Sequence, residues 1–219
     1  MQLVSVNVGQ VQPILYAKRS GQTGIYKLPA SAPVRVTVNG LSGDAICDVE
    51  NHGGLDQAIY IYGTPDYAWW SDALGRALAP GTFGENLTIS ALESAKLSIG
   101  DRLHVGAVIL EVTAPRIPCV TLATRMGDPA FVKRFRAAER PGLYCRVIQP
   151  GFVQTGAPVS LEPYHGPTIT AIEMFRDFYE AELSEATIRR HLAAPIAIRD
   201  RIAKEERLAQ LLAATANSA

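Results

Sequence analysis

Short runs of β-branched and aliphatic residues dominate the first two thirds of the chain. They fall at 3–8, 34–38, 58–62, 102–105, 108–112 and 143–148. Turn-forming pairs such as Asn39-Gly40 and Pro150-Gly151 lie between them. Strands of about five residues at close, irregular spacing are typical of a closed or nearly closed β-barrel. Gly106 marks a hairpin between two of these runs, because glycine adopts a positive φ without steric cost.

Two stretches within this β-rich region have the periodicity of helices instead. Residues 65–78 and 129–138 place apolar side chains at helical intervals, and both fit a period of 3.6 residues. Asp66 and Asp128 stand where N-caps are expected. The fold class is therefore mainly β with some α.

The character of the sequence changes after Pro163. Thr170 and Glu173 form a capping box ahead of apolar positions, and Ser184 is placed to cap a second helix. Pro195 breaks the chain before a third amphipathic stretch. We therefore predict a β-barrel domain over 1–163 and a three-helix module over 164–219, whose apolar stripes would form its own core.

Composition and charge exclude several classes of protein. Lys and Arg number 21 and Asp and Glu number 21, so the chain has no net charge and no surface typical of nucleic-acid binding. No signal peptide is evident, and no apolar run approaches the roughly 20 residues of a membrane span. Three cysteines without CxxC spacing indicate reduced thiols, so we expect a cytoplasmic protein without a structural zinc site. Rossmann and P-loop motifs are also missing.

Cys119 is the strongest candidate for chemistry. It ends the segment Pro115-Arg116-Ile117-Pro118-Cys119, which follows an apolar strand. Two prolines rigidify this segment, and Arg116 favours the thiolate electrostatically. A buried cysteine in an ordinary loop is the competing interpretation, since free cysteine is among the most buried residue types. Cys47 and Cys145 lie on apolar runs and are interpreted as core residues.

A second candidate segment runs from His52 through Gly53 and Gly54 to Asp56. Paired glycines allow a ligand to approach the backbone and expose N–H groups, while His52 and Asp56 add a titratable base and an acceptor. A tight turn before a strand explains the same residues without any function. Asn86, in Phe83-Gly84-Glu85-Asn86-Leu87, offers an amide for ligand binding or simply the polar tip of a turn.

Lys27 and Arg116 are the preferred anion-binding pair among the basic residues. Both lie next to prolines or in otherwise apolar segments, and guanidinium groups suit phosphate and other oxyanions.

Taken in order, these segments resemble the MOSC domain, the domain named for the C-terminal part of molybdenum cofactor sulfurases. The resemblance covers about 1–163, and the helical end is similar to the three-helix domain of the YiiM-like branch. The motifs that carry it are Ser20 to Lys27, Gly40 to Asp44, His52 to Ala58, Phe83 to Leu87, Ile99 to Asp101 and Arg116 to Cys119. It implies a MOSC-type barrel, similar to the pyruvate kinase barrel.

The resemblance also implies a cofactor, the molybdenum cofactor (molybdopterin), with Cys119 as the protein ligand to the metal. Lys27, Arg116, Gly53, Gly54 and Asn86 would then bind the pterin and its phosphate, and His52 and Asp56 would assist proton transfer. A soft thiolate suits molybdenum. The implied activity is reduction of N-hydroxylated bases, and hence resistance to 6-hydroxylaminopurine. Electrons would come from a separate reductase, because the chain shows no flavin, haem or iron–sulfur motif.

Two other functions stay open. Cys119 could carry sulfur as a persulfide, or the domain could carry the cofactor without turnover. A metal-free thiol enzyme would use Cys119 as nucleophile and His52 as base. The helical module is a candidate for contacting the pocket mouth, the reductase or a second copy in a homodimer.

Overall fold

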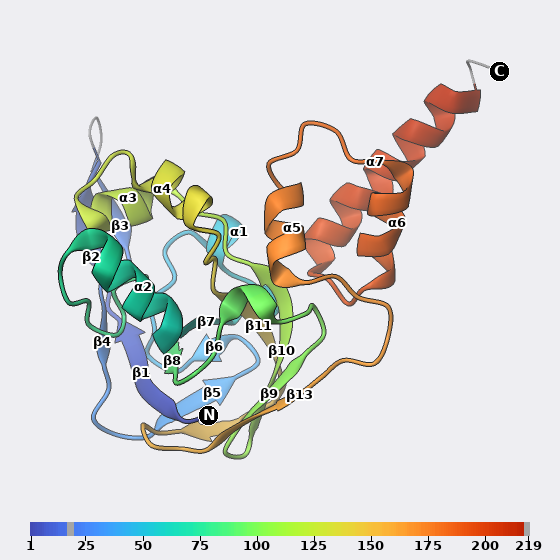
Figure 1. The fold of residues 1–219 in the computed structure, drawn as a ribbon. Helices are drawn as coiled ribbons and strands as arrows, with labels where there is room; N and C mark the ends of the chain where they lie inside the picture. The colour runs from blue at the N-terminus through green and yellow to red at the C-terminus, as the bar shows by residue number, and fades with distance from the viewer. Residues whose placement is uncertain (17–19, 217–219) are drawn as a thin grey trace.

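A β-barrel with helices at one end and a helical module at its side makes up the protein (Figure 1). The computed structural model describes residues 1–16 and 20–216. The last three residues of the predicted module, 217–219, thus lie outside the described residues. The mainly β fold with added helices agrees with the sequence prediction.

The barrel is built on an eight-stranded sheet. Its pairs are antiparallel except β7 with β8, which are parallel. In spatial order the strands are β13 (Val159–Glu162), β9 (Arg102–Val105), β10 (Val108–Pro115), β11 (Leu143–Gln149), β7 (Ile59–Gly63), β8 (Leu87–Ile89), β1 (Leu3–Gly9) and β4 (Lys27–Pro29). Two smaller sheets join β12 (Gly151–Val153), β5 (Val34–Thr37) and β6 (Gly40–Leu41), and β2 (Gln12–Leu15) with β3 (Ser20–Thr23).

Backbone hydrogen bonds close the sheet on itself. The Leu3 amide donates to the Ala157 carbonyl at 2.9 Å, and the Val159 amide donates to the Met1 carbonyl at 3.0 Å. These bonds join the start of β1 to β13 at the far edge of the sheet. Closure removes exposed strand edges, which is why a chain of many short strands adopts a barrel.

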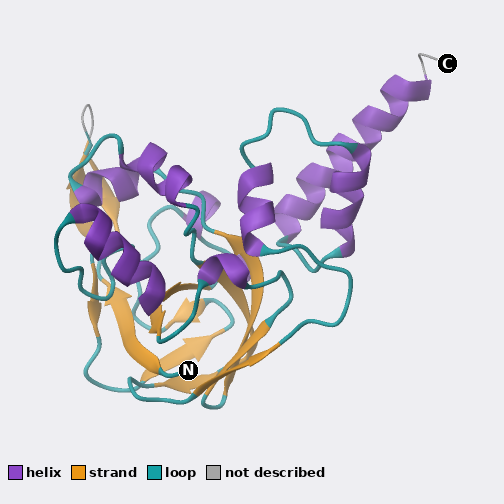
Figure 2. Cartoon of the chain, in the orientation of Figure 1, coloured by secondary structure: helices purple, strands orange, loops and turns teal. Residues whose placement is uncertain are grey.

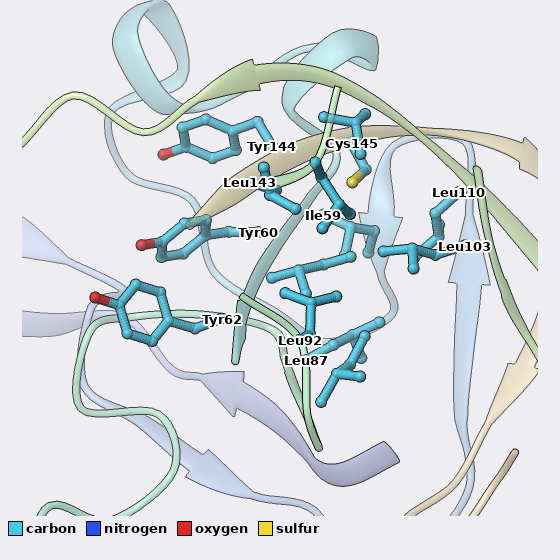
Figure 3. Close-up of a cluster of buried hydrophobic side chains, with 14 of the residues drawn as sticks. Ile59, Tyr60, Tyr62, Leu87, Leu92, Leu103, Leu110, Leu143, Tyr144 and Cys145 are labelled. Atoms are coloured by element: carbon cyan, nitrogen blue, oxygen red, sulfur yellow. The ribbon is translucent and has the colours of Figure 1, made fainter. Parts of the chain in front are cut away.

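Aliphatic side chains fill the barrel, and aromatic side chains fill the space under its helices. Figure 3 shows Tyr60, Tyr62 and Tyr144 with their hydroxyl groups pointing the same way, away from the aliphatic cluster. Phe83 stacks on Tyr62 at 4.5 Å between ring centroids. Trp70 of α2 (Thr64–Leu74) lies 5.0 Å from Phe131 of α4 (Phe131–Ala138). These contacts fix the barrel end that carries the loops.

The predicted strands, the hairpin at Gly106 and the helices near 65–78 and 129–138 are all present. Both N-caps were predicted wrongly. The N-cap of α4 is Ala130, and Asp128 lies two residues earlier, where its Oδ1 accepts from the Ala130 amide at 2.8 Å. Helix α2 begins at Thr64 after Gly63, so Asp66 lies inside its first turn. Asp66 is instead buried, where it accepts from Ser94 Oγ at 2.7 Å and from Arg140 Nη1 at 2.7 Å. The pattern also missed two short helices, α1 (Val49–His52) and α3 (Val120–Met126).

The C-terminal module contains α5 (Ala171–Asp177), α6 (Glu185–Ala193) and α7 (Ile198–Ala216), and Figure 2 shows it beside the barrel. The capping box at Thr170 and the cap at Ser184 are confirmed. The prediction that its apolar stripes form a separate core is wrong, because Met174, Phe175 and Ile196 belong to the same buried cluster as the barrel residues. No helix within 1–16 and 20–216 is long and apolar enough to cross a bilayer.

Candidate functional site

A cavity of about 670 Å³ lies where the barrel loops meet the helical module. This volume falls within the range of small-molecule and cofactor sites. The barrel contributes residues from 22–27, 44–52, 84–86 and 114–121. The module contributes Met174, Phe178, Arg199, Asp200 and Lys204. The walls therefore come from segments that are far apart in the sequence.

Cys119 lies in this cavity at the N-cap of α3. Strand β10 ends at Pro115, and the loop between them carries Pro118, so the backbone leading to the thiol is short and stiff. Burial disfavours the thiolate, but a hydrogen bond with His52 and the charge of Arg116 outweigh it and lower the pKa of Cys119 to about 6. A thiol with that pKa is ionised at neutral pH.

His52 is held in place on both sides of its ring. It is the last residue of α1, a helix capped by Asp48, whose Oδ1 accepts from the Asn51 amide at 3.2 Å. Its Nδ1 lies 2.9 Å from the Tyr144 hydroxyl, and the ring also hydrogen-bonds with the Cys119 thiol. The structure therefore brings together two residues singled out from the sequence. Tyr144, which sequence reasoning missed, orients the imidazole.

Arg116 is a buried cation beside the thiol. Its Nη1 donates to the Phe83 carbonyl, and its guanidinium lies 4.8 Å from the centroid of the Tyr60 ring. Burial alone would lower the pKa of Arg116, but Tyr144, Tyr60 and Cys119 raise it, so the group stays charged. Among the described residues its Nε has no hydrogen-bond partner. A buried guanidinium with an unused donor is suited to an anionic ligand.

Lys27 and Asn86 also line the cavity, but other protein groups already engage both. Lys27 forms an ion pair with Asp44, and burial lowers the pKa of its ammonium group. Asn86 donates to Asp44 Oδ2 at 2.8 Å and accepts from the Tyr60 amide at 3.0 Å. Asp44 further accepts from the Gly9 amide at 2.7 Å. Sequence reasoning placed Asp44 in a family motif but did not name it as a site residue, and the structure shows that it joins three segments of this wall.

The structure places Gly53, Gly54 and Asp56 away from the cavity lining. The Gly53 amide donates to the Val49 carbonyl at 3.1 Å, and Gly54 has a φ of 92°. Asp56 pairs with Arg146 Nε at 3.0 Å and accepts from the Ile198 amide at 2.6 Å. Asp56 therefore joins the barrel to the start of α7. Roles for these three residues in cofactor binding or catalysis remain predictions without a cavity contact.

Of the two cysteines interpreted as core residues, the structure buries one and exposes the other. Cys145 is buried, as expected, and burial raises the pKa of its thiol. Cys47 was interpreted as a core residue, and this is wrong. It is exposed, in the segment between β6 and α1, and it lines the cavity. Its apolar neighbours Ala45 and Ile46 imitate a strand, whereas the chain there has no sheet partner.

Comparison with known proteins agrees with this architecture. Residues 48–160 match the model of the MOSC domain. The chain belongs to the MOSC domain family. An uncharacterized Bacillus subtilis (strain 168) protein, YflK, is 34% identical over 200 residues, which are 84% of this chain and 90% of YflK. The crystal structure of YiiM from Geobacillus stearothermophilus is similar with a TM-score of 0.76 and 27% identity, covering 94% of this chain and 98% of that one.

A further relative of this MOSC protein differs in size. A Gibberella moniliformis (strain M3125 / FGSC 7600) protein named reductase is 33% identical over 153 residues. These residues are 65% of this chain but only 26% of that protein. The matched region is thus a small part of a much longer chain.

Proposed function

We propose that this MOSC protein binds the molybdenum cofactor through Cys119 and reduces N-hydroxylated bases, converting N–OH to N–H. The observation that carries the proposal is the low pKa of Cys119, about 6, in a cavity of roughly 670 Å³. The thiolate lies next to a buried, charged Arg116 whose Nε is unpartnered in the described structure.

The donor set of the cavity fits a metal that arrives with its own ligands. In the described part of the chain, no group of three or more His, Cys, Asp or Glu side chains could hold a metal ion. A metal bound only by protein is thereby disfavoured. A metal carried by the two sulfurs of a pterin needs only one further soft ligand, and a thiolate suits it. Arg116 would bind the anionic part of such a cofactor.

Reduction of N–OH to N–H consumes two electrons and two protons and releases water. The cofactor, when bound, supplies the electron transfer. His52 would supply a proton to the departing oxygen, since its imidazole lies at the cavity wall beside Cys119. Tyr144 holds Nδ1 of that ring, so the imidazole keeps one orientation through the reaction. The hydrogen bond from His52 and the charge of Arg116 together favour the ionised Cys119 sulfur.

Electrons would come from a separate reductase. A relative named reductase supports a reductive role, and the part of it that matches this chain is 26% of its length. We propose that this chain supplies the cofactor-binding part of such a system, and that a second protein supplies the reducing equivalents. In the cell this activity would remove toxic N-hydroxylated bases.

Metal content tests the proposal most directly. The chain is purified from a host that makes the molybdenum cofactor, as wild type, Cys119→Ala and Cys47→Ala. Cys47 is a matched control, because it is an exposed cysteine in the same cavity. We expect near-stoichiometric molybdenum in wild type and Cys47→Ala and almost none in Cys119→Ala. Equal, negligible molybdenum in all three would contradict the proposal, provided that a known molybdoenzyme loads normally in that host.

The same low pKa supports a second function, sulfur carriage, because a thiolate can attack the outer sulfur of a donor persulfide, forming the new S–S bond as the donor leaves as a thiolate. Intact-mass measurement separates the two functions. A mass increase of one sulfur on Cys119, without molybdenum, would favour a carrier. Bound molybdenum with turnover of an N-hydroxylated base would favour the enzyme.

A further inference from the structure

The helical module lines the cavity with three charged groups that the proposed chemistry does not use, Arg199, Asp200 and Lys204. Asp200 and Lys204 are four residues apart on α7 and lie on one face of that helix. Both are partly buried and both line the cavity. Across the described ranges, neither side chain takes part in a hydrogen bond or a close ion pair.

Both groups are only partly desolvated, and each lies near opposite charge: Asp200 near Lys204 and Arg199, and Lys204 near Asp200 and Asp177. Burial raises the pKa of Asp200 and lowers that of Lys204, so each group is held where its charge is poorly solvated. A partly desolvated charge without a direct contact gains a hydrogen bond when a ligand supplies one. The pair thus offers one acceptor and one donor toward the cavity.

An apolar surface from α5 and the residue after it accompanies this pair. Met174 lines the cavity as a buried side chain, and Phe178 lines it with 60% of its surface exposed. An exposed aromatic ring and a thioether are favourable contacts for the face of a flat, polarisable ligand.

We propose that this recognition wall, made of Met174, Phe178, Asp200 and Lys204, binds the base of the substrate. The ligand is a planar nitrogen heterocycle with an exocyclic amino group next to a ring nitrogen. Asp200 accepts from the amino N–H, Lys204 donates to the ring nitrogen, and Phe178 contacts the ring face. The inference rests on the proposed function, since such an amine is the product of reducing an N-hydroxylated base.

Adenine and purine are the probes that test this assignment, because purine lacks only the exocyclic amino group. Each is titrated by calorimetry into the full chain purified from a cofactor-making host. We expect wild type to prefer adenine. Asp200→Ala should lower that preference roughly tenfold, the size of one hydrogen bond to a charged group. Lys204→Met should weaken both ligands about equally and leave the preference intact, since both carry the ring nitrogen.

A matched variant separates recognition from folding. Glu206→Ala removes an exposed carboxylate from the same helix and should leave both affinities unchanged. Thermal unfolding shows whether each variant is folded. An unchanged adenine preference in folded Asp200→Ala, or no binding of adenine by wild type, would overturn the inference. Molybdenum content is measured on the same samples, and its loss from wild type would contradict the proposed function without affecting the binding comparison.

Discussion

The barrel side and the module side of the cavity differ in how their polar groups are satisfied. On the barrel side, Asp44 holds Lys27, Asn86 and the Gly9 amide, and Tyr144 holds His52. On the module side, Asp200 and Lys204 have no direct partner among the described residues. The first wall is fixed before any ligand arrives, as an anchoring site requires. The second is completed by its ligand, as a recognition site requires.

This difference follows from how firmly the fold holds the backbone that carries each set of side chains. The barrel residues project from strands and short loops that the closed sheet and its aromatic cluster immobilise. The module joins the barrel through a shared apolar core and through polar contacts, including Asp56 with the Ile198 amide and Arg146 with the Pro195 and Ile196 carbonyls, while Phe178, Asp200 and Lys204 lie outside that core. Variation at Phe178, Asp200 and Lys204 would therefore change selectivity without disturbing the anchor.

The largest effect is expected from breaking the barrel-side network. Asp44→Ala leaves the buried Lys27 ammonium without its counter-ion, and breaking such a pair costs about 3–5 kcal/mol. Urea unfolding measures the loss. Glu93→Ala is the control, because its pair with Lys96 is exposed and should cost about 1 kcal/mol or less. Similar losses in the two variants would show that the network is not a stabilising one.

Phe175→Ala tests how strongly the module is joined to the barrel. Phe175 is 1% exposed and belongs to the shared core, so truncation should cost about 3 kcal/mol. Because both tryptophans lie in α2, their fluorescence reports on the barrel, while helical circular dichroism includes the module. We expect the two signals to change together in denaturant.

Phe178→Ala is the matched control, since that ring is 60% exposed and its removal should change stability little. Loss of helical signal before any change in tryptophan fluorescence would contradict a shared core. The module would then fold as a unit of its own.

His52→Ala tests whether the barrel side of the cavity holds Cys119 as a thiolate. The groups facing Cys119 are His52, Arg116, Tyr144 and the Leu122 amide, and the His52 hydrogen bond is the largest contribution lowering its pKa. In cofactor-free protein, wild-type alkylation should rise with pH through about 6. Without His52 the pKa should return toward the ordinary value near 8.5, which slows alkylation at pH 7 by roughly thirtyfold.

Iodoacetamide labelling in a Cys47→Ser background measures this rate on Cys119, because Cys145 is buried. His104→Ala is the control, since His104 pairs with Glu162 on β9 and β13, and its loss should change nothing at Cys119. An unchanged pH profile of alkylation in His52→Ala would show that His52 does not lower the pKa of Cys119.

Local pattern predicted much of this architecture. Runs of β-branched residues and the capping signals at Thr170 and Ser184 predict strands and helices because each acts within a few residues of itself. The proline-framed segment likewise singled out Cys119 beside Arg116, and the fold places this thiol at the cavity with a lowered pKa, while its role in chemistry stays a prediction. Helix α3 was missed because it is short and begins with β-branched residues.

Contacts between distant segments could not be predicted in the same way. Tyr144 and His52 are 92 residues apart, and Asp56 and Ile198 are 142 apart. Nothing near Asp44 shows that its carboxylate meets Lys27, and nothing near Asp200 shows that it faces a cavity built mostly by the barrel. A polar residue acquires its role from the partner that the fold brings to it, and only the fold supplies that partner.

The smallest effect is expected at the point where the module begins. Glu173 accepts from the Thr170 amide at 2.9 Å and from Arg190 Nη2 at 3.0 Å, and these bonds lower its pKa to about 2. Its folded pKa lies below the value near 4.3 of an unfolded chain, so its contribution is present above that pH and is lost as pH falls toward 2. Glu173→Gln should cost about 1 kcal/mol or less at pH 7, because the carboxylate is partly solvated.

The pH dependence distinguishes this cap from a general packing effect. The difference in unfolding free energy between wild type and Glu173→Gln should shrink as pH falls from about 5 toward 3, since wild-type Glu173 then loses part of its advantage. Glu180→Gln is the control, an exposed carboxylate near the end of the same helix. A difference that stays constant over that range would mean that the charge of Glu173 does not stabilise the start of α5. The positions of Met174 and Phe178 beside the cavity would then be set by the apolar core alone.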